Sequence, residues 1–209
     1  MNTSLPYIYL FKKMDGQHLP PRGQRYIWMT CKRLACRKRL LLLLLLLPAA
    51  LHAQTSWRGL ISSSWWDPIN WTNGVPGASV DAIIGDASFI GLFQPNITTT
   101  SSCKSLIIGG SRISTLTVSK GLTIGGNVTI NSGNTLSQKG ATLTVKGNWT
   151  NNGTYTTTST SAKATFSGTA QTIAGSSITG FRQLTIGAGS TVTLNVNMTV
   201  SGTFSVSGT

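Results

Sequence analysis

Apolar and polar residues alternate over residues 122–130 and again over residues 143–149, and the two stretches match at a spacing of 21 residues. The aligned pairs are Leu122 with Leu143, Ile124 with Val145, Asn127 with Asn148, and Val128 with Trp149. A period of two is typical of a strand with one buried face. A Gly-Asn pair interrupts each copy and predicts a bend in the backbone. One such unit cannot bury its apolar face alone, so the repeat predicts stacked coils.

The same alternation continues from Cys103 to the end of the chain. Short runs of Leu, Ile, Val, Phe and Thr are separated by Gly, Ser and Asn, and no helical period occurs. We therefore predict an all-β fold, a right-handed parallel β-helix or β-solenoid over residues 101–209, with about five coils. The alternatives are a β-sandwich and a disordered Thr/Ser-rich stalk, although the regularly placed apolar residues argue against a stalk. Stacked equivalent positions also predict outward ladders of Thr and Asn with few charges.

Residues 54–100 lack the repeat and form a tryptophan-rich segment with Trp57, Trp65, Trp66 and Trp71. Turn-forming residues are dense at 73–77, and short strands are expected at 80–84 and 89–93. We predict that this segment caps the N-terminal end of the solenoid and that its indole rings close the apolar interior. The competing interpretation is that Trp65, Trp66 and Trp71 form a platform on which sugar rings stack.

Residues 29–53 have the parts of a secretory signal peptide. A basic segment precedes an uninterrupted leucine run over residues 40–47, and small residues predict cleavage between Ala53 and Gln54. Residues 40–53 are fewer than the roughly 20 needed to cross a bilayer, so no membrane span is expected after cleavage. Residues 1–28 match no part of a signal peptide. We expect them to be a non-native or disordered extension, with translation starting at Met29 and the mature chain exported to the cell surface or the medium.

The formal charge of +13 is concentrated in the leader. Residues 1–53 contain nine Lys or Arg against Asp15, a net charge of +8, and residues 54–209 contain eight against three Asp, a net charge of +5. These eight cations are scattered singly along the mature sequence, without a basic helix or cluster that would follow phosphates. We therefore expect no nucleic-acid partner.

Few residues of the mature chain are suited to catalysis. It contains no His and no Glu, which removes the usual general base and the usual zinc ligand. Glycoside hydrolysis normally needs two carboxylates. Those available are Asp67, Asp81 and Asp86, and we expect them to hold turns and strand ends rather than to act as a catalytic pair or bind calcium. Cys103 is the single cysteine and is expected to be buried in a strand. We expect no enzyme activity, no metal and no cofactor.

Two stretches resemble known sequence motifs. Residues 65–76 read WWDPINWTNGVP, which is similar to the opening of many exported repeat proteins of gram-negative bacteria that use type IX secretion. Residues 166–186, with Phe166, Gly168, Gln171 and Gly175 at fixed spacing, resemble the rungs that follow that opening in the same proteins. Together the resemblance covers about residues 55–209. It implies a large β-helical, adhesin-like surface protein, often with a C-terminal sorting domain, and it is poorly specific for activity.

The chain lacks a sorting domain and stops inside a repeat at residues 207–209, so we expect the N-terminal part of a longer protein, truncated at its C-terminus. An uncovered last coil predicts self-association through the open end of the solenoid. The predicted function is a non-catalytic exported scaffold that displays polar side chains to glycans or surface proteins. The alternatives are a carbohydrate-binding module that uses Trp65, Trp66 and Trp71, and the non-catalytic leading segment of a larger polysaccharide-degrading enzyme.

Overall fold

The computed structural model describes residues 54–207, which consist of short strands and one 3₁₀ helix, η2 (Pro68–Asn70). The strands form three faces. Face A contains β1 (Gln54–Ser56), β2 (Asp81–Ile84), β5 (Leu106–Ile108), β8 (Val128–Ile130), β11 (Trp149–Asn151), β14 (Ala170–Ala174) and β17 (Thr191–Leu194). Face B contains β3 (Asn96–Ile97), β6 (Thr115–Val118), β9 (Thr135–Gln138) and β12 (Thr154–Thr157), followed by β15 (Thr179–Phe181) and β18 (Met198–Val200). Face C contains β4 (Ser101–Cys103), β7 (Leu122–Ile124), β10 (Thr142–Val145), β13 (Lys163–Phe166), β16 (Gln183–Ile186) and β19 (Phe204–Val206).

The predicted signal peptide, its cleavage residue Ala53 and the predicted N-terminal extension lie outside the described residues. Gln54, predicted to be the first residue of the mature chain, is the first residue of β1.

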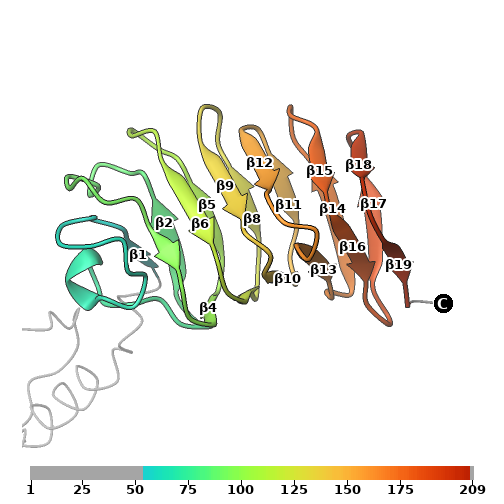
Figure 1. Cartoon of the computed structure of the whole chain (residues 1–209), viewed down its shortest axis with the longest axis horizontal. Coiled ribbons are helices and arrows are strands. Elements are labelled where there is room, and N and C mark those ends of the chain that lie inside the picture. The colour runs from blue at the N-terminus through green and yellow to red at the C-terminus, as the bar shows by residue number, and fades with distance from the viewer. Residues whose placement is uncertain (1–53, 208–209) are drawn as a thin grey trace, which may run out of the picture. The chain divides into compact units, whose positions relative to one another are not determined.

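Successive strands take the three faces in turn, so that one coil contributes one strand to each face. Six coils stack side by side, from β2-β3-β4 to β17-β18-β19, along the horizontal axis of Figure 1. Every ladder between named strands of the described part is parallel. The predicted β-solenoid is confirmed. The β-sandwich alternative is wrong, because a sandwich is built from antiparallel sheets.

Residues that match in the sequence repeat are strand partners in adjacent coils of the stack. Leu122 pairs with Leu143 on face C, and Val128 pairs with Trp149 on face A, as the alignment predicts. The spacing is not constant between all coils, because the corners that join the faces differ in length. Most strands of the first five coils alternate buried and half-buried residues, as in β5 and β8.

The buried positions of successive coils form one continuous apolar interior. On face A, for example, Leu106, Val128, Trp149 and Ile173 lie in one column. Parallel strands stack at about 4.8 Å, so each interior side chain contacts its equivalents in the coils on either side. Burying one such side chain stabilises the fold by about 1.5–3 kcal/mol. The stack is thus held together by contacts between neighbouring coils.

Aromatic and polar side chains fill the interior of the fourth coil. The Trp149 ring lies 5.0 Å from Tyr155 and 5.6 Å from Phe181, measured between ring centroids. Its Nε1 donates to Thr179 Oγ1 at 3.1 Å. The Tyr155 hydroxyl donates to Gln138 Oε1, and burial raises the pKa of Tyr155 well above its ordinary range. Each buried polar group here has a partner, which buried hydrogen-bonding groups require.

The motif at residues 166–175 has a structural explanation. Gly175 has a φ of +125°, and a Cβ at this position would overlap the carbonyl oxygen of Asn151. A Cβ on Gly168 would overlap the carbonyl oxygen of Lys146. Gln171 lies in β14, between these two glycines, and fixes the corner before the strand. Its Oε1 accepts from the Gly168 N–H at 2.7 Å, and its Nε2 donates to two carbonyls of the chain that leads into β11, at 3.1 and 2.5 Å. The motif therefore encodes the tight corners before and after β14.

The N-terminal segment continues the stack as well as covering it. β1 pairs with β2 on face A, and Ser64 bridges Asn96 beside β3 on face B. β2 and β3 belong to the first complete coil, so the complete coils begin near residue 81, whereas the repeat in the sequence places their start at residue 101. Residues 85–95 separate β2 from β3 and conceal the period.

The expected strand at residues 89–93 is wrong. These residues form a loop that crosses the N-terminal end, where Gly91 N–H donates to the Arg58 carbonyl at 2.9 Å and Phe93 N–H donates to the Gly59 carbonyl at 3.2 Å. The strand expected at residues 80–84 is confirmed as β2.

Candidate functional site

Three tryptophans close the N-terminal end of the interior. Trp57 and Trp65 are fully buried, and Trp71 is 2% exposed. The Trp71 ring centroid lies 5.1 Å from that of Trp57 and 4.7 Å from that of Trp65, both in edge-to-face contact, a geometry that aromatic pairs prefer. Trp71 Nε1 donates to the Trp65 carbonyl, and Trp57 Nε1 donates to the Phe93 carbonyl, each at 2.7 Å. We call Trp57, Trp65 and Trp71 the tryptophan plug.

Trp66 has the opposite environment, with 51% of its surface exposed. The glycan platform expected from Trp65, Trp66 and Trp71 is therefore not formed, because the first and last of these rings have no accessible face. Trp65 is held inward through its backbone N–H, which donates to the Asn96 carbonyl at 3.3 Å. Trp66 is the ring of these three that a ligand can reach.

The three carboxylates of the described chain have separate structural contacts. Asp67 caps η2, since its Oδ1 accepts from the Ile69 N–H at 3.1 Å. Asp81 lies 3.3 Å from Lys104 Nζ. Asp86 accepts from Ser56 Oγ at 2.5 Å and from a backbone N–H at 2.9 Å. Within residues 54–207, no three His, Cys, Asp or Glu side chains gather into a group that could hold a metal ion.

Cys103 is buried in β4, as predicted. Burial, and secondarily the negative charge of Asp81, raise the pKa of its thiol to about 12. The thiolate is the nucleophilic form of cysteine. A thiol that stays protonated at neutral pH has a packing role here.

The most regular surface feature of the described chain is a column of hydroxyl groups along face C. One Ser or Thr from each coil occupies the outward central position of its strand. The members, in stacking order, are Ser102, Thr123, Thr144, Thr165, Thr185 and Ser205. Neighbouring hydroxyls are separated by about 4.8 Å along the axis. We call this set the hydroxyl column; it confirms the expected threonine ladder and was not singled out as a site in the sequence.

Asparagine side chains connect the coils at the entrance to face A. Asn127 Oδ1 accepts from the backbone N–H of Asn148 at 2.8 Å. Asn148 Oδ1 in turn accepts from the backbone N–H of Thr172 at 2.9 Å. The asparagines of the repeat therefore hydrogen-bond along the stack, and their positions have a structural role.

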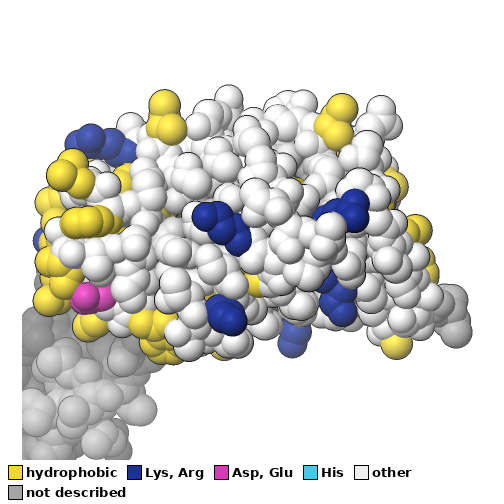
Figure 2. Space-filling model, in the orientation of Figure 1, with side chains coloured by type: hydrophobic (Ala, Val, Ile, Leu, Met, Phe, Trp, Pro, Cys, Tyr) yellow, Lys and Arg dark blue, Asp and Glu magenta, His cyan; other side chains and the backbone are white. Residues whose placement is uncertain are grey.

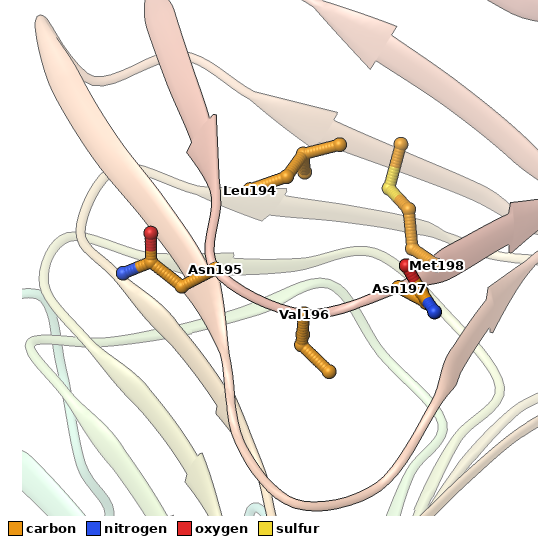
Figure 3. A pocket seen from close by; sticks show the side chains of 5 residues that line it. All are labelled: Leu194, Asn195, Val196, Asn197 and Met198. Atoms are coloured by element: carbon orange, nitrogen blue, oxygen red, sulfur yellow. The ribbon is translucent and has the colours of Figure 1, made fainter.

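The C-terminal end of the described stack is open. A hollow of about 640 Å³ is lined by Leu194, Asn195, Val196, Asn197 and Met198. The side chains of Leu194 and Met198 point into the same space between the strands, whereas Asn195 points away from it (Figure 3). Leu194 and Phe204 are 50% and 55% exposed, although the residues beneath them, Ile173 and Leu184, are buried. This hollow is an uncovered section of the interior and contains no charged group.

Comparison of the chain with protein families, with curated proteins and with solved structures gives no match. In the part of the chain that the structure describes, no helix has the length and apolar character needed to cross a membrane. The functional argument therefore depends on the surface of the solenoid itself.

Proposed function

We propose that this chain is a non-catalytic, exported scaffold that binds glycans or surface proteins by multivalent display. The hydroxyl column carries the proposal, because it places six hydroxyl groups at one regular spacing on a rigid parallel sheet. A ligand that contacts several equivalent groups gains avidity without a strong single site.

The test is retention of beads coated with the chain on glycan-coated and protein-coated surfaces under flow. We expect retention to rise steeply with the density of the chain on the bead. The variant Thr144→Val/Thr165→Val removes two hydroxyls of the column and keeps β-branched side chains of similar shape. The matched control is Thr129→Val/Thr150→Val, which alters two stacked outward positions of face A. Retention that is independent of density, or equal losses in both variants, would refute display by face C.

A second candidate function is supported by the exposure of Trp66. An exposed indole ring can stack on a sugar, and Trp66 lies at the opposite end of the stack from the open hollow. In this case Trp66→Ala would abolish binding to insoluble polysaccharide without changing the circular dichroism spectrum. Unchanged binding by Trp66→Ala would eliminate the candidate.

A further inference from the structure

Beyond residue 86, all side-chain charges of the described chain have the same sign. From residue 87 to residue 207 the sequence contains seven Lys or Arg and no Asp or Glu. The three Asp lie at positions 67, 81 and 86, at the end where the stack begins. Lys104 is paired with Asp81 at 3.3 Å. Figure 2 shows separate Lys and Arg side chains along the stack, with acidic colour only near the N-terminal end of this view.

Four of these cations follow the border between face B and face C, one in each of four consecutive coils. Lys120 lies between β6 and β7, and Lys139 lies between β9 and β10. Lys163 is the first residue of β13, and Arg182 lies between β15 and β16. With about 4.8 Å between coils, the four cations extend over roughly 15 Å. Their separations in the sequence are unequal, so they look isolated when the sequence is read alone.

The other border of face C also has cations. Lys104 directly follows β4, and Lys146 directly follows β10. The hydroxyl column lies between the two borders. Face C is therefore a strip with hydroxyl groups along its centre and Lys or Arg side chains at both margins.

Four of the six cations of the strip are available for a ligand, because Lys104 is paired with Asp81 and Arg182 Nη1 donates to the Ser201 carbonyl at 3.1 Å. Lys120, Lys139 and Lys146 are exposed, and Lys163 is half-buried. None of these four has a side-chain hydrogen bond or ion pair to another residue within 54–207. The register pairs Lys163 with Thr142 and Gln183, so it is not stacked directly on another cation. Staggering reduces their repulsion, but charges within about 10 Å of each other still interact at moderate salt.

We infer that face C binds a linear acidic polysaccharide, whose carboxylate or sulfate groups pair with the marginal cations and whose hydroxyl groups bond to the central column. The inference rests on the proposed function, because it names the ligand class of the same displayed face. A nucleic acid fits less well. Proteins that bind single-stranded nucleic acids stack the bases on aromatic side chains. No aromatic residue occupies an outward position on the β-strands of face C in the described chain.

The experiment measures binding of the full chain to immobilised polygalacturonate by biolayer interferometry at three salt concentrations. The test variant is Lys139→Gln/Lys163→Gln on face C. The matched control is Arg58→Gln/Arg112→Gln, which removes the same charge from the N-terminal segment and from the corner between faces A and B. Both variants keep residues 1–53, so the charge of the leader is common to all measurements.

We expect the face C variant to weaken binding about tenfold, because it loses two exposed charge contacts with the ligand. We also expect the slope of log affinity against log salt to fall by about one to two. The control variant should bind like the parent chain. Equal weakening in both variants, or none in either, would overturn the inference.

Two further probes separate the ligand classes. Methyl-esterified pectin has the same backbone without the charges, and we expect it to bind at least tenfold more weakly than polygalacturonate. Equal binding of the esterified polymer would overturn the inference and leave the proposed display function standing, which the retention assay decides independently. Single-stranded DNA that binds more tightly than polygalacturonate, with the same dependence on Lys139 and Lys163, would overturn it in favour of a nucleic-acid ligand.

Discussion

The tryptophan plug allows one hydrogen bond to be tested by two similar substitutions. Trp65 and Trp71 are adjacent, in edge-to-face contact and almost completely buried. Trp71 Nε1 donates to the Trp65 carbonyl at 2.7 Å, whereas Trp65 Nε1 is buried without a partner among the described residues. Trp71→Phe and Trp65→Phe therefore remove the same atoms, but only the first of them breaks a hydrogen bond.

The expected difference can be worked out term by term. Both substitutions lose the same ring area and leave cavities of similar size, so these losses largely cancel in the comparison. Trp71→Phe also leaves a buried carbonyl without its donor, which costs about 1–3 kcal/mol. Trp65→Phe has no such cost, because it removes a donor that was already unsatisfied. We expect Trp71→Phe to be less stable than Trp65→Phe by about 2 kcal/mol.

The assay is urea unfolding followed by far-UV circular dichroism, which does not depend on the fluorescence of the altered rings. With an m-value of about 2 kcal/mol/M, the two midpoints should differ by about 1 M. Trp66→Phe is the control, and its exposed ring predicts a change below about 0.5 kcal/mol. Equal midpoints for the two buried positions, or a lower midpoint for Trp65→Phe, would refute the role assigned to this hydrogen bond.

Three other predictions concern a corner, the buried thiol and the open end. Gly175→Ala should lower the free energy of unfolding by about 3 kcal/mol or more, because the φ of Gly175 is +125° and a Cβ there would overlap a carbonyl oxygen. The control is Gly189→Ala in the same urea titration. Gly189 has a φ of +70° and free space around it, so this substitution should cost about 1 kcal/mol. Burial raises the pKa of the Cys103 thiol from 9.0 to about 12, so between these pH values the thiol ionises only in the unfolded chain. The free energy of unfolding should therefore fall by up to about 4 kcal/mol from pH 9 to pH 12. Cys103→Ala should remove this part of the pH dependence. The tryptophan plug closes one end of the stack, so only the open end with Leu194 and Phe204 is free to associate, and light scattering should show concentration-dependent dimers. Leu194→Lys/Phe204→Lys should abolish these dimers. A parent chain that stays monomeric at high concentration would contradict this.

Much of the fold could be predicted because neighbouring coils are also neighbours in the sequence. The match of Leu122 with Leu143 and of Val128 with Trp149 identified the stacked positions directly, since each coil buries its apolar face only against the next one. The outward threonines follow from the same pattern. The first coil was missed, because the loop at residues 85–95 breaks the period on which the prediction depends.

The sequence by itself determined the solenoid, since the period of two and the repeat near 21 residues leave stacked coils as the way to bury alternate apolar residues. Only the tertiary structure decided which tryptophans are accessible. Trp65 and Trp66 are adjacent and chemically identical, and their burial depends on the loop and strands packed around them. The cations of face C were also beyond sequence reasoning. Corners of different length separate Lys120, Lys139 and Lys163 unequally along the chain, and the stack alone brings them into line, because position along the axis depends on the coil to which a residue belongs.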